Sequence, residues 1–334
     1  MIIFRPVRED DLNDIMRLAS RAGVGLTSLP NDRARLAARI RRSIDTFAGR
    51  LPRAQQGFLF VLEDTEAARV AGVSAIEVAV GLDEPFYNFR LQRTVRASKE
   101  LGVYKNIELL NLSYDHTGHS ELCTLFLDPE YQKNRNGLLL SKARFLFISA
   151  FRSWFSSHIF AELRGLLDDN GGSPFWDALG HHFFAIPFAE ADRLSGSGMK
   201  TFIAELMPSY PIYVTLLPDS AKKAIGQVHA QTAPARAILE KEGFRWEGSV
   251  DIFDAGPVLE AETDKLKAIR RAQCMPAHQL TLTPQSPVIV ANNQFAHFRA
   301  LLIAAEEPQT LDQPLLDALQ SGERDPLHVL TLNP

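Results

Sequence analysis

Hydrophobic positions along the chain follow an order of strands and helices that is typical of an α/β fold. Short apolar runs predict strands at residues 2–5, 57–64, 70–80, 121–127, 159–165 and 200–206. Apolar residues at helical spacing predict helices over 8–19, 31–47 and 138–155, and Asn31 is expected to cap the second. Two later helices are marked by their ends, because Ser173-Pro174 begins one and Thr232 and Gly243 bound the other.

Two segments depart from this order. Residues 81–114 combine aromatic and basic side chains with little periodicity, so we interpret them as an insertion over the main sheet. After Phe244 the chain becomes strand-like and rich in turns. We therefore expect a domain boundary near residue 246, with a larger domain over 1–245 and a small β-rich domain over 246–334.

The composition places the chain among soluble globular proteins. Its 334 residues are 46% hydrophobic and 23% charged, which fits about two domains of ordinary composition. Lys plus Arg number 36 and Asp plus Glu number 40, so the formal net charge is −4. A nucleic-acid-binding surface usually carries a basic excess. The charge balance therefore argues against nucleic acid as a partner, and any bound polyanion should be small and held locally.

The cysteine content and the lengths of the apolar stretches indicate in which cellular compartment the protein is expected. Only Cys123 and Cys274 occur, which is typical of a reducing compartment rather than of a disulfide framework. The first residues lack the apolar core of a signal peptide, and no apolar stretch approaches the roughly 20 residues of a membrane span. The sequence predicts a cytoplasmic protein that is not inserted in a membrane.

The segment after the strand at 121–127 has the features of an anion site. The strand stops at Asp128-Pro129, a loop with Lys133 and Arg135 follows, and a long helix begins near Gly137. The first amides of a helix lack intrahelical acceptors and lie at the positive end of its dipole, which favours phosphate binding. Lys142 and Arg144 are expected to add positive charge.

The spacing Gln132-x-x-Arg135-x-Gly137 resembles the pyrophosphate loop of GNAT acyl-CoA N-acyltransferases, although Arg135 stands where glycine is usual. Longer strings are similar to one family, the arginine N-succinyltransferases, over nearly all of residues 1–270. They include Gly25-Leu-Thr-Ser-Leu-Pro30, Ser120-Glu-Leu-Cys-Thr-Leu-Phe-Leu127, Glu162-Leu-Arg-Gly165, Gly226-Gln-Val-His229 and Val250-Asp-Ile-Phe-Asp-Ala-Gly-Pro257.

This resemblance implies an α/β fold of GNAT type, with a mixed central sheet flanked by helices. It implies transfer of the succinyl group of succinyl-CoA to the α-amine of L-arginine, with succinyl-CoA as co-substrate and no permanently bound cofactor. The family's proton donor corresponds to His229 and its succinyl-CoA contact to Leu125. The expected acyl-CoA site comprises Leu125, Gln132, Lys133, Arg135, Asn136 and Gly137.

Several alternatives stay open at this point. Carboxylates suit the planar guanidinium of the acceptor, and the candidates are Glu121, Glu205, Asp251 and Asp254. His116-x-x-His119 lacks further ligands, so we expect no metal, and Cys123 is interpreted as a buried small side chain. Ornithine as acceptor, a homo-oligomer and dependence on a related companion subunit are not distinguished by the sequence.

Overall fold

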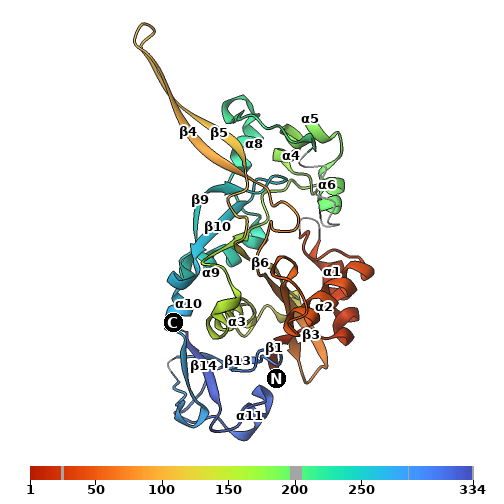
Figure 1. Cartoon of the computed structure of the whole chain (residues 1–334), viewed down its shortest axis with the longest axis vertical. Coiled ribbons are helices and arrows are strands. Elements are labelled where there is room, and N and C mark those ends of the chain that lie inside the picture. Colours follow the sequence, from red (N-terminus) through yellow and green to blue (C-terminus); the bar gives the residue numbers. More distant parts are fainter. Residues whose placement is uncertain (24–25, 196–204, 285, 333–334) are drawn as a thin grey trace.

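One continuous sheet organises the computed structural model, which describes residues 1–23, 26–195, 205–284 and 286–332 (Figure 1). Within them, fourteen strands follow one another in the order β11-β14-β12-β13-β1-β2-β3-β6-β7-β10-β9-β4-β5-β8. The strands are β1 (Ile2–Pro6), β2 (Gly57–Asp64), β3 (Arg69–Glu77), β4 (Asn88–Ser98), β5 (Val103–Ser113), β6 (Ser120–Leu127), β7 (His158–Glu162), β8 (Ile212–Tyr213), β9 (Arg245–Val250), β10 (Pro257–Glu262), β11 (Gln273–Pro276), β12 (Val288–Asn292), β13 (Ala300–Ile303) and β14 (Pro326–Thr331).

Helices cover both faces of the sheet. They are α1 (Leu12–Ala22), α2 (Arg33–Phe47), α3 (Asn136–Ala150), α4 (Pro174–Ala178), α5 (Gly180–Phe184), α6 (Phe188–Ser195), α8 (Asp219–Ala224), α9 (Ala233–Glu242), α10 (Lys267–Arg271) and α11 (Gln313–Leu319). Successive side chains of a strand point to opposite faces. In β2, Phe58 and Phe60 accordingly pack with the residues of α3, whereas Leu59 and Val61 pack with those of α1 and α2.

The predicted fold class, a mixed sheet with helices on both faces, is confirmed. Most element positions are confirmed as well, and Ser173 and Gly243 stand at the expected helix ends. The helix cap predicted at Asn31 is wrong by one residue, because Asp32 accepts the capping hydrogen bond from Arg35 N–H. Residues 200–204 of the strand predicted over 200–206 lie outside the described residues, and the next two residues are helical.

Residues 81–114, interpreted as an insertion, contain a long hairpin that extends the sheet. Strand β4 pairs with β5 along its whole length and with β9 at Phe89↔Val250. Figure 1 shows the hairpin projecting from one end of the molecule. Its outer half exposes side chains such as Leu101 and Tyr104 to solvent on both faces, which explains why no regular apolar period marks it.

The chain after residue 246 contributes strands both to the centre of the sheet and to the end formed by β11 to β14. Strand β10 pairs with β7 in its centre, whereas β11 to β14 and α11 pack around a separate apolar cluster. The two parts are joined by the pair of Phe4 in β1 with Ala300 in β13. The division at residue 246 stays a prediction. Over the described residues, no helix combines the length and apolar character needed to cross a membrane.

Candidate active site

The centre of the sheet contains one pair of strands that separate. Strands β6 and β7 are parallel, and their register consists of Ser120↔Ile159 and Glu121↔Phe160. Farther along, Thr124 in β6 has a positive φ of 53°, and the register against β3 shifts at the same level. A β-branched residue in this backbone region is strained, and such a bulge redirects the strand. The parting strands border a cavity of about 920 Å³.

The anion-binding loop predicted from the sequence lies at this cavity. Residues 132–137 all line it, and Arg135 is the N-cap of α3 without a side-chain capping bond. Asn134 and Arg135 have φ of 51° and 62°, so Arg135 adopts the left-handed conformation that favours glycine. The GNAT resemblance places a glycine at this point, and the backbone here meets that conformational requirement with an arginine.

A buried carboxylate anchors the start of the loop. Asp128, at the end of β6, is fully buried and accepts hydrogen bonds from Arg17 at 2.7 Å and from Arg69 at 3.0 Å. Its other oxygen accepts from Arg21 at 2.8 Å. These arginines come from α1 and β3, so the point where β6 ends is fixed by two neighbouring elements.

Two cations expected to strengthen the phosphate site lie elsewhere on α3. Lys142 is paired with Glu242. Arg144 is buried and bonds to Ala75 O and Cys123 O of the sheet. An α-helix rises about 1.5 Å per residue, so both positions lie more than one turn beyond the start of α3, and their side chains bind neighbouring elements. The expectation that both residues add charge to the loop is therefore wrong.

His229 stands beside the cavity, although it is not among the described residues that line it. The backbone N–H of His229 donates to Arg164 O at 2.9 Å. Its ring Nδ1 accepts from the backbone N–H of Gln231, which lines the cavity, at 3.2 Å. Burial, and then the positive charge of Arg164, lower the pKa of His229 below its usual value. Leu125 lies directly on the cavity wall.

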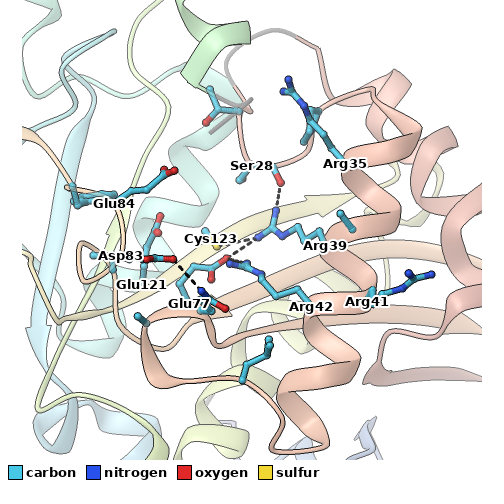
Figure 2. A pocket seen from close by; sticks show the side chains of 18 of the residues that line it. Ser28, Arg35, Arg39, Arg41, Arg42, Glu77, Asp83, Glu84, Glu121 and Cys123 are labelled. Atoms are coloured by element: carbon cyan, nitrogen blue, oxygen red, sulfur yellow. Dashed lines mark hydrogen bonds and ion pairs between the residues drawn. The ribbon is translucent and has the colours of Figure 1, made fainter. Parts of the chain in front are cut away.

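A second cavity of about 1010 Å³ lies on the α2 side of the sheet. Figure 2 shows arginines of α2 along one side and the carboxylates of Asp83, Glu84 and Glu121 on the other. Ser28, Glu121 and Cys123 line both cavities. The two cavities therefore meet at the point where β6 and β7 begin to separate.

The four carboxylates predicted to meet a guanidinium occupy different environments. Glu121 lines both cavities, and Glu205 is exposed on the surface. Asp251 accepts from the N–H groups of Phe253 and Asp254, at 2.7 and 2.9 Å. Asp254 is buried and accepts from two further backbone N–H groups, and burial together with the charge of Asp251 raises its pKa. Asp251 and Asp254 thus hold the local backbone together.

The sequence did not identify Arg39 or Glu77 as parts of the site. Arg39 lies on α2, and its side chain is only 15% exposed. Arg39 and Arg42 both bind Glu77, at 3.3 and 2.6 Å. The signal that could have found Arg39 is its place next to Leu36 and Ile40, two positions of the buried stripe of α2.

His116 and Cys123 each form contacts within the fold. His116 is buried, and its Nδ1 lies 2.7 Å from Asn88 Oδ1. Burial, followed by the charge of Glu121, raises the pKa of the Cys123 thiol to about 12, so the thiol stays protonated at neutral pH. Among the described parts of the chain, no three His, Cys, Asp or Glu side chains are grouped as metal ligands.

Comparisons with known proteins agree on one family. The family "Arginine N-succinyltransferase beta subunit" matches residues 2–268. A protein of Photorhabdus laumondii subsp. laumondii named arginine N-succinyltransferase is 58% identical, over 100% of this chain and 99% of the relative. A protein of Yersinia pseudotuberculosis with the same name is 51% identical, over 99% of this chain and 98% of the relative. The solved structure of arginine/ornithine succinyltransferase subunit AI from Pseudomonas aeruginosa superposes with a TM-score of 0.90 at 34% identity, covering 100% and 99% of the two chains. The chain therefore belongs to the arginine N-succinyltransferase family.

Proposed function

We propose that this protein transfers the succinyl group of succinyl-CoA to the α-amine of L-arginine, giving N2-succinyl-L-arginine and CoA. The separation of β6 from β7, with the bulge at Thr124, is the observation that carries this proposal. Strand backbone that has lost its neighbour has N–H and C=O groups available for an extended ligand. The amide-containing pantetheine arm of CoA is such a ligand.

The lining of the first cavity offers a place for each part of an acyl-CoA. Its wall runs from Leu125 on β6 to Gly137 at the start of α3. The phosphates would lie at the helix N-terminus, near Gln132, Lys133, Arg135 and Asn136, and the thioester near Leu125. Such fixed positioning of the reacting carbon supplies much of the rate in acyl transfer.

The reaction itself needs an oxyanion donor and a proton for the leaving thiolate. The neutral α-amine attacks the thioester carbon, forming the new C–N bond and a tetrahedral oxyanion. A backbone N–H of β6 near Leu125 would stabilise this charge, which is worth about 2.7–4 kcal/mol when the geometry is right. The C–S bond then breaks, the CoA thiolate takes a proton from an acid of the protein, and the proton released by the amine nitrogen restores that acid.

His229 is the proposed source of the proton for the thiolate. Because Nδ1 accepts from Gln231, the ring proton of the neutral imidazole is assigned to Nε2. In the neutral ring, Nε2–H is therefore the group able to donate a hydrogen bond to the leaving sulfur. Transfer of the proton itself requires the imidazolium form, which becomes neutral and then takes up the proton that the amine nitrogen releases. General acid catalysis of this kind contributes about 10²–10⁴-fold to the rate.

The second cavity is the proposed acceptor site. Its opposing carboxylate and arginine walls suit an amino acid that carries a guanidinium and an α-carboxylate. Glu121 is the favoured partner for the guanidinium, because it lines both cavities and stands where acceptor and donor would meet. We further propose a cytoplasmic location, in keeping with the two unbridged thiols, Cys123 and Cys274.

The assay is release of CoA by the purified single chain. We expect release from succinyl-CoA that depends on L-arginine, with succinylation of the α-amine identified by mass spectrometry. A parallel assay with L-ornithine ranks the two acceptors. No release from the single chain, followed by activity after addition of a related subunit, would support the companion-subunit alternative. No arginine-dependent release under either condition would contradict the proposal.

A further inference from the structure

Arg144 is a buried arginine in the middle of α3. Only 2% of its surface is exposed, and its neighbours Ala143 and Phe145 are completely buried. Moving a guanidinium from water into such surroundings costs free energy unless an anion compensates the charge. A leucine or methionine would fill the same space without this cost, so packing alone does not account for the arginine.

The contacts of Arg144 leave its charge uncompensated. It donates four hydrogen bonds, to Ser141 O at 3.2 Å and to Ser141 Oγ, Ala75 O and Cys123 O at 3.4 Å each. All four acceptors are neutral, and all four distances exceed the usual 2.9–3.0 Å. Over the described residues, Arg144 forms no ion pair with a carboxylate. Burial lowers its pKa to about 10.

The guanidinium lies where the acyl group of the donor would be placed. Its partner Cys123 O immediately precedes the bulge at Thr124, and Arg144 itself lines the first cavity together with Thr124 and Leu125. The side chain thus reaches from α3 to the separation of the two strands, opposite the face that carries α2.

Two other arginines that line this cavity lie near carboxylates, and a third, Arg135 of the loop, is exposed. Arg21 binds Asp128 at 2.8 Å, and Arg164 lies within the electrostatic influence of Asp254 and Asp192. Across the sheet, Arg39 is paired with Glu77 at 3.3 Å. Among the described arginines that line this cavity, Arg144 is the one that is fully buried, and no carboxylate is paired with it.

We propose that the Arg144 guanidinium binds the free carboxylate of the succinyl group and thereby selects a dicarboxylic acyl donor. This inference rests on the proposed function. In succinyl-CoA a short ethylene linker separates the thioester from the carboxylate, so a cation beside the bulge is within reach of the carboxylate when the thioester is at Leu125. A buried, charge-assisted bidentate contact rejects a donor that lacks the carboxylate, because the cation is then left unpaired.

The test compares equilibrium binding of succinyl-CoA and butyryl-CoA, which have acyl chains of the same carbon number, to the wild type and to Arg144→Met. Titration calorimetry without acceptor keeps the result independent of the acceptor's identity. We expect the variant to bind succinyl-CoA about 10- to 100-fold more weakly, while butyryl-CoA binding changes by less than about threefold. Lys142→Met, on the same helix but paired with Glu242, is the matched control and should leave the ratio of the two affinities unchanged.

A role limited to holding the carbonyls of the bulge would weaken both donors by the same factor, and that result in Arg144→Met would overturn the inference. If Arg144→Met does not fold, Arg144→Lys keeps the charge but loses the planar fork, and it should weaken succinyl-CoA binding selectively, by about tenfold. Equal changes for both donors in this variant would also overturn the inference. Failure of the proposed function would be seen differently, as wild-type protein that binds succinyl-CoA selectively but releases no CoA with arginine.

Discussion

The backbone N–H of Gln231 donates a hydrogen bond to Nδ1 of His229 across 3.2 Å. This contact belongs to the short helical turn that His229 caps, Ala230–Thr232, which leads into α9. Local backbone thus fixes both the orientation of the imidazole and the nitrogen that carries its proton. Gln231 also lines the acyl-CoA cavity, so the ring is held next to the space where the thiolate would leave.

Replacing His229 by alanine should remove the proton donor and leave the fold intact, because the residue is at the surface of a turn. We expect kcat to fall by about 10²–10⁴-fold, with an unchanged circular dichroism spectrum. His182, an exposed histidine on α5, provides the control, and His182→Ala should retain wild-type kcat. Wild-type turnover by His229→Ala would contradict the assigned role.

Glu121→Gln should weaken the acceptor rather than the donor. Loss of one charged partner of the guanidinium is expected to raise the KM for L-arginine by about 10- to 100-fold, with little change in the KM for succinyl-CoA. The same change at Glu205, which is exposed, should have no effect on either constant. The assignment is wrong if Glu205→Gln reproduces the effect, or if Glu121→Gln acts on the donor instead.

Gly137→Ala separates phosphate binding from folding. A Cβ at this position would meet Leu127 Cδ2 at 3.7 Å, an ordinary contact, so the protein itself can accept the methyl group. Alanine near the start of a helix should leave the melting temperature unchanged or raise it slightly. The added methyl group should crowd the pyrophosphate and raise the KM for succinyl-CoA about tenfold, which is roughly the effect of losing one good hydrogen bond. An unchanged KM would place the phosphates elsewhere.

His119 should make the protein less stable in mild acid. Burial, and then the neighbouring His116 and His158, lower its pKa. The unfolded chain, with a histidine pKa of about 6.5, therefore binds more protons than the folded chain, and the free energy of unfolding decreases as the pH falls through that value. Urea denaturation at about pH 7.5 and pH 5.5 measures this loss, which should be smaller in His119→Gln. Asp254 contributes with the opposite sign because its pKa is raised, but this contribution is the same in the wild type and in His119→Gln. Equal losses of stability in the wild type and the variant would contradict the prediction.

Local sequence signals were sufficient to predict the ends of the elements that surround the site. Ser173, Gly243 and the end of β6 at Asp128 follow from capping and turn chemistry, which acts within a few residues. The pairing of Phe89 with Val250 joins segments far apart in the chain, and no local pattern encodes such a pair. The same holds for Arg144, because its separation from the phosphate loop depends on how α3 is rotated against the sheet.

The measurement that tests the central claim most directly is a crystal structure of the protein with succinyl-CoA and a non-reacting arginine analogue. We predict that the phosphates lie at Asn136 and Gly137, the thioester beside Leu125 between the separated strands β6 and β7, and the succinyl carboxylate on Arg144. The guanidinium of the analogue should lie near Glu121. Binding of succinyl-CoA outside the separation of β6 and β7 would contradict the account.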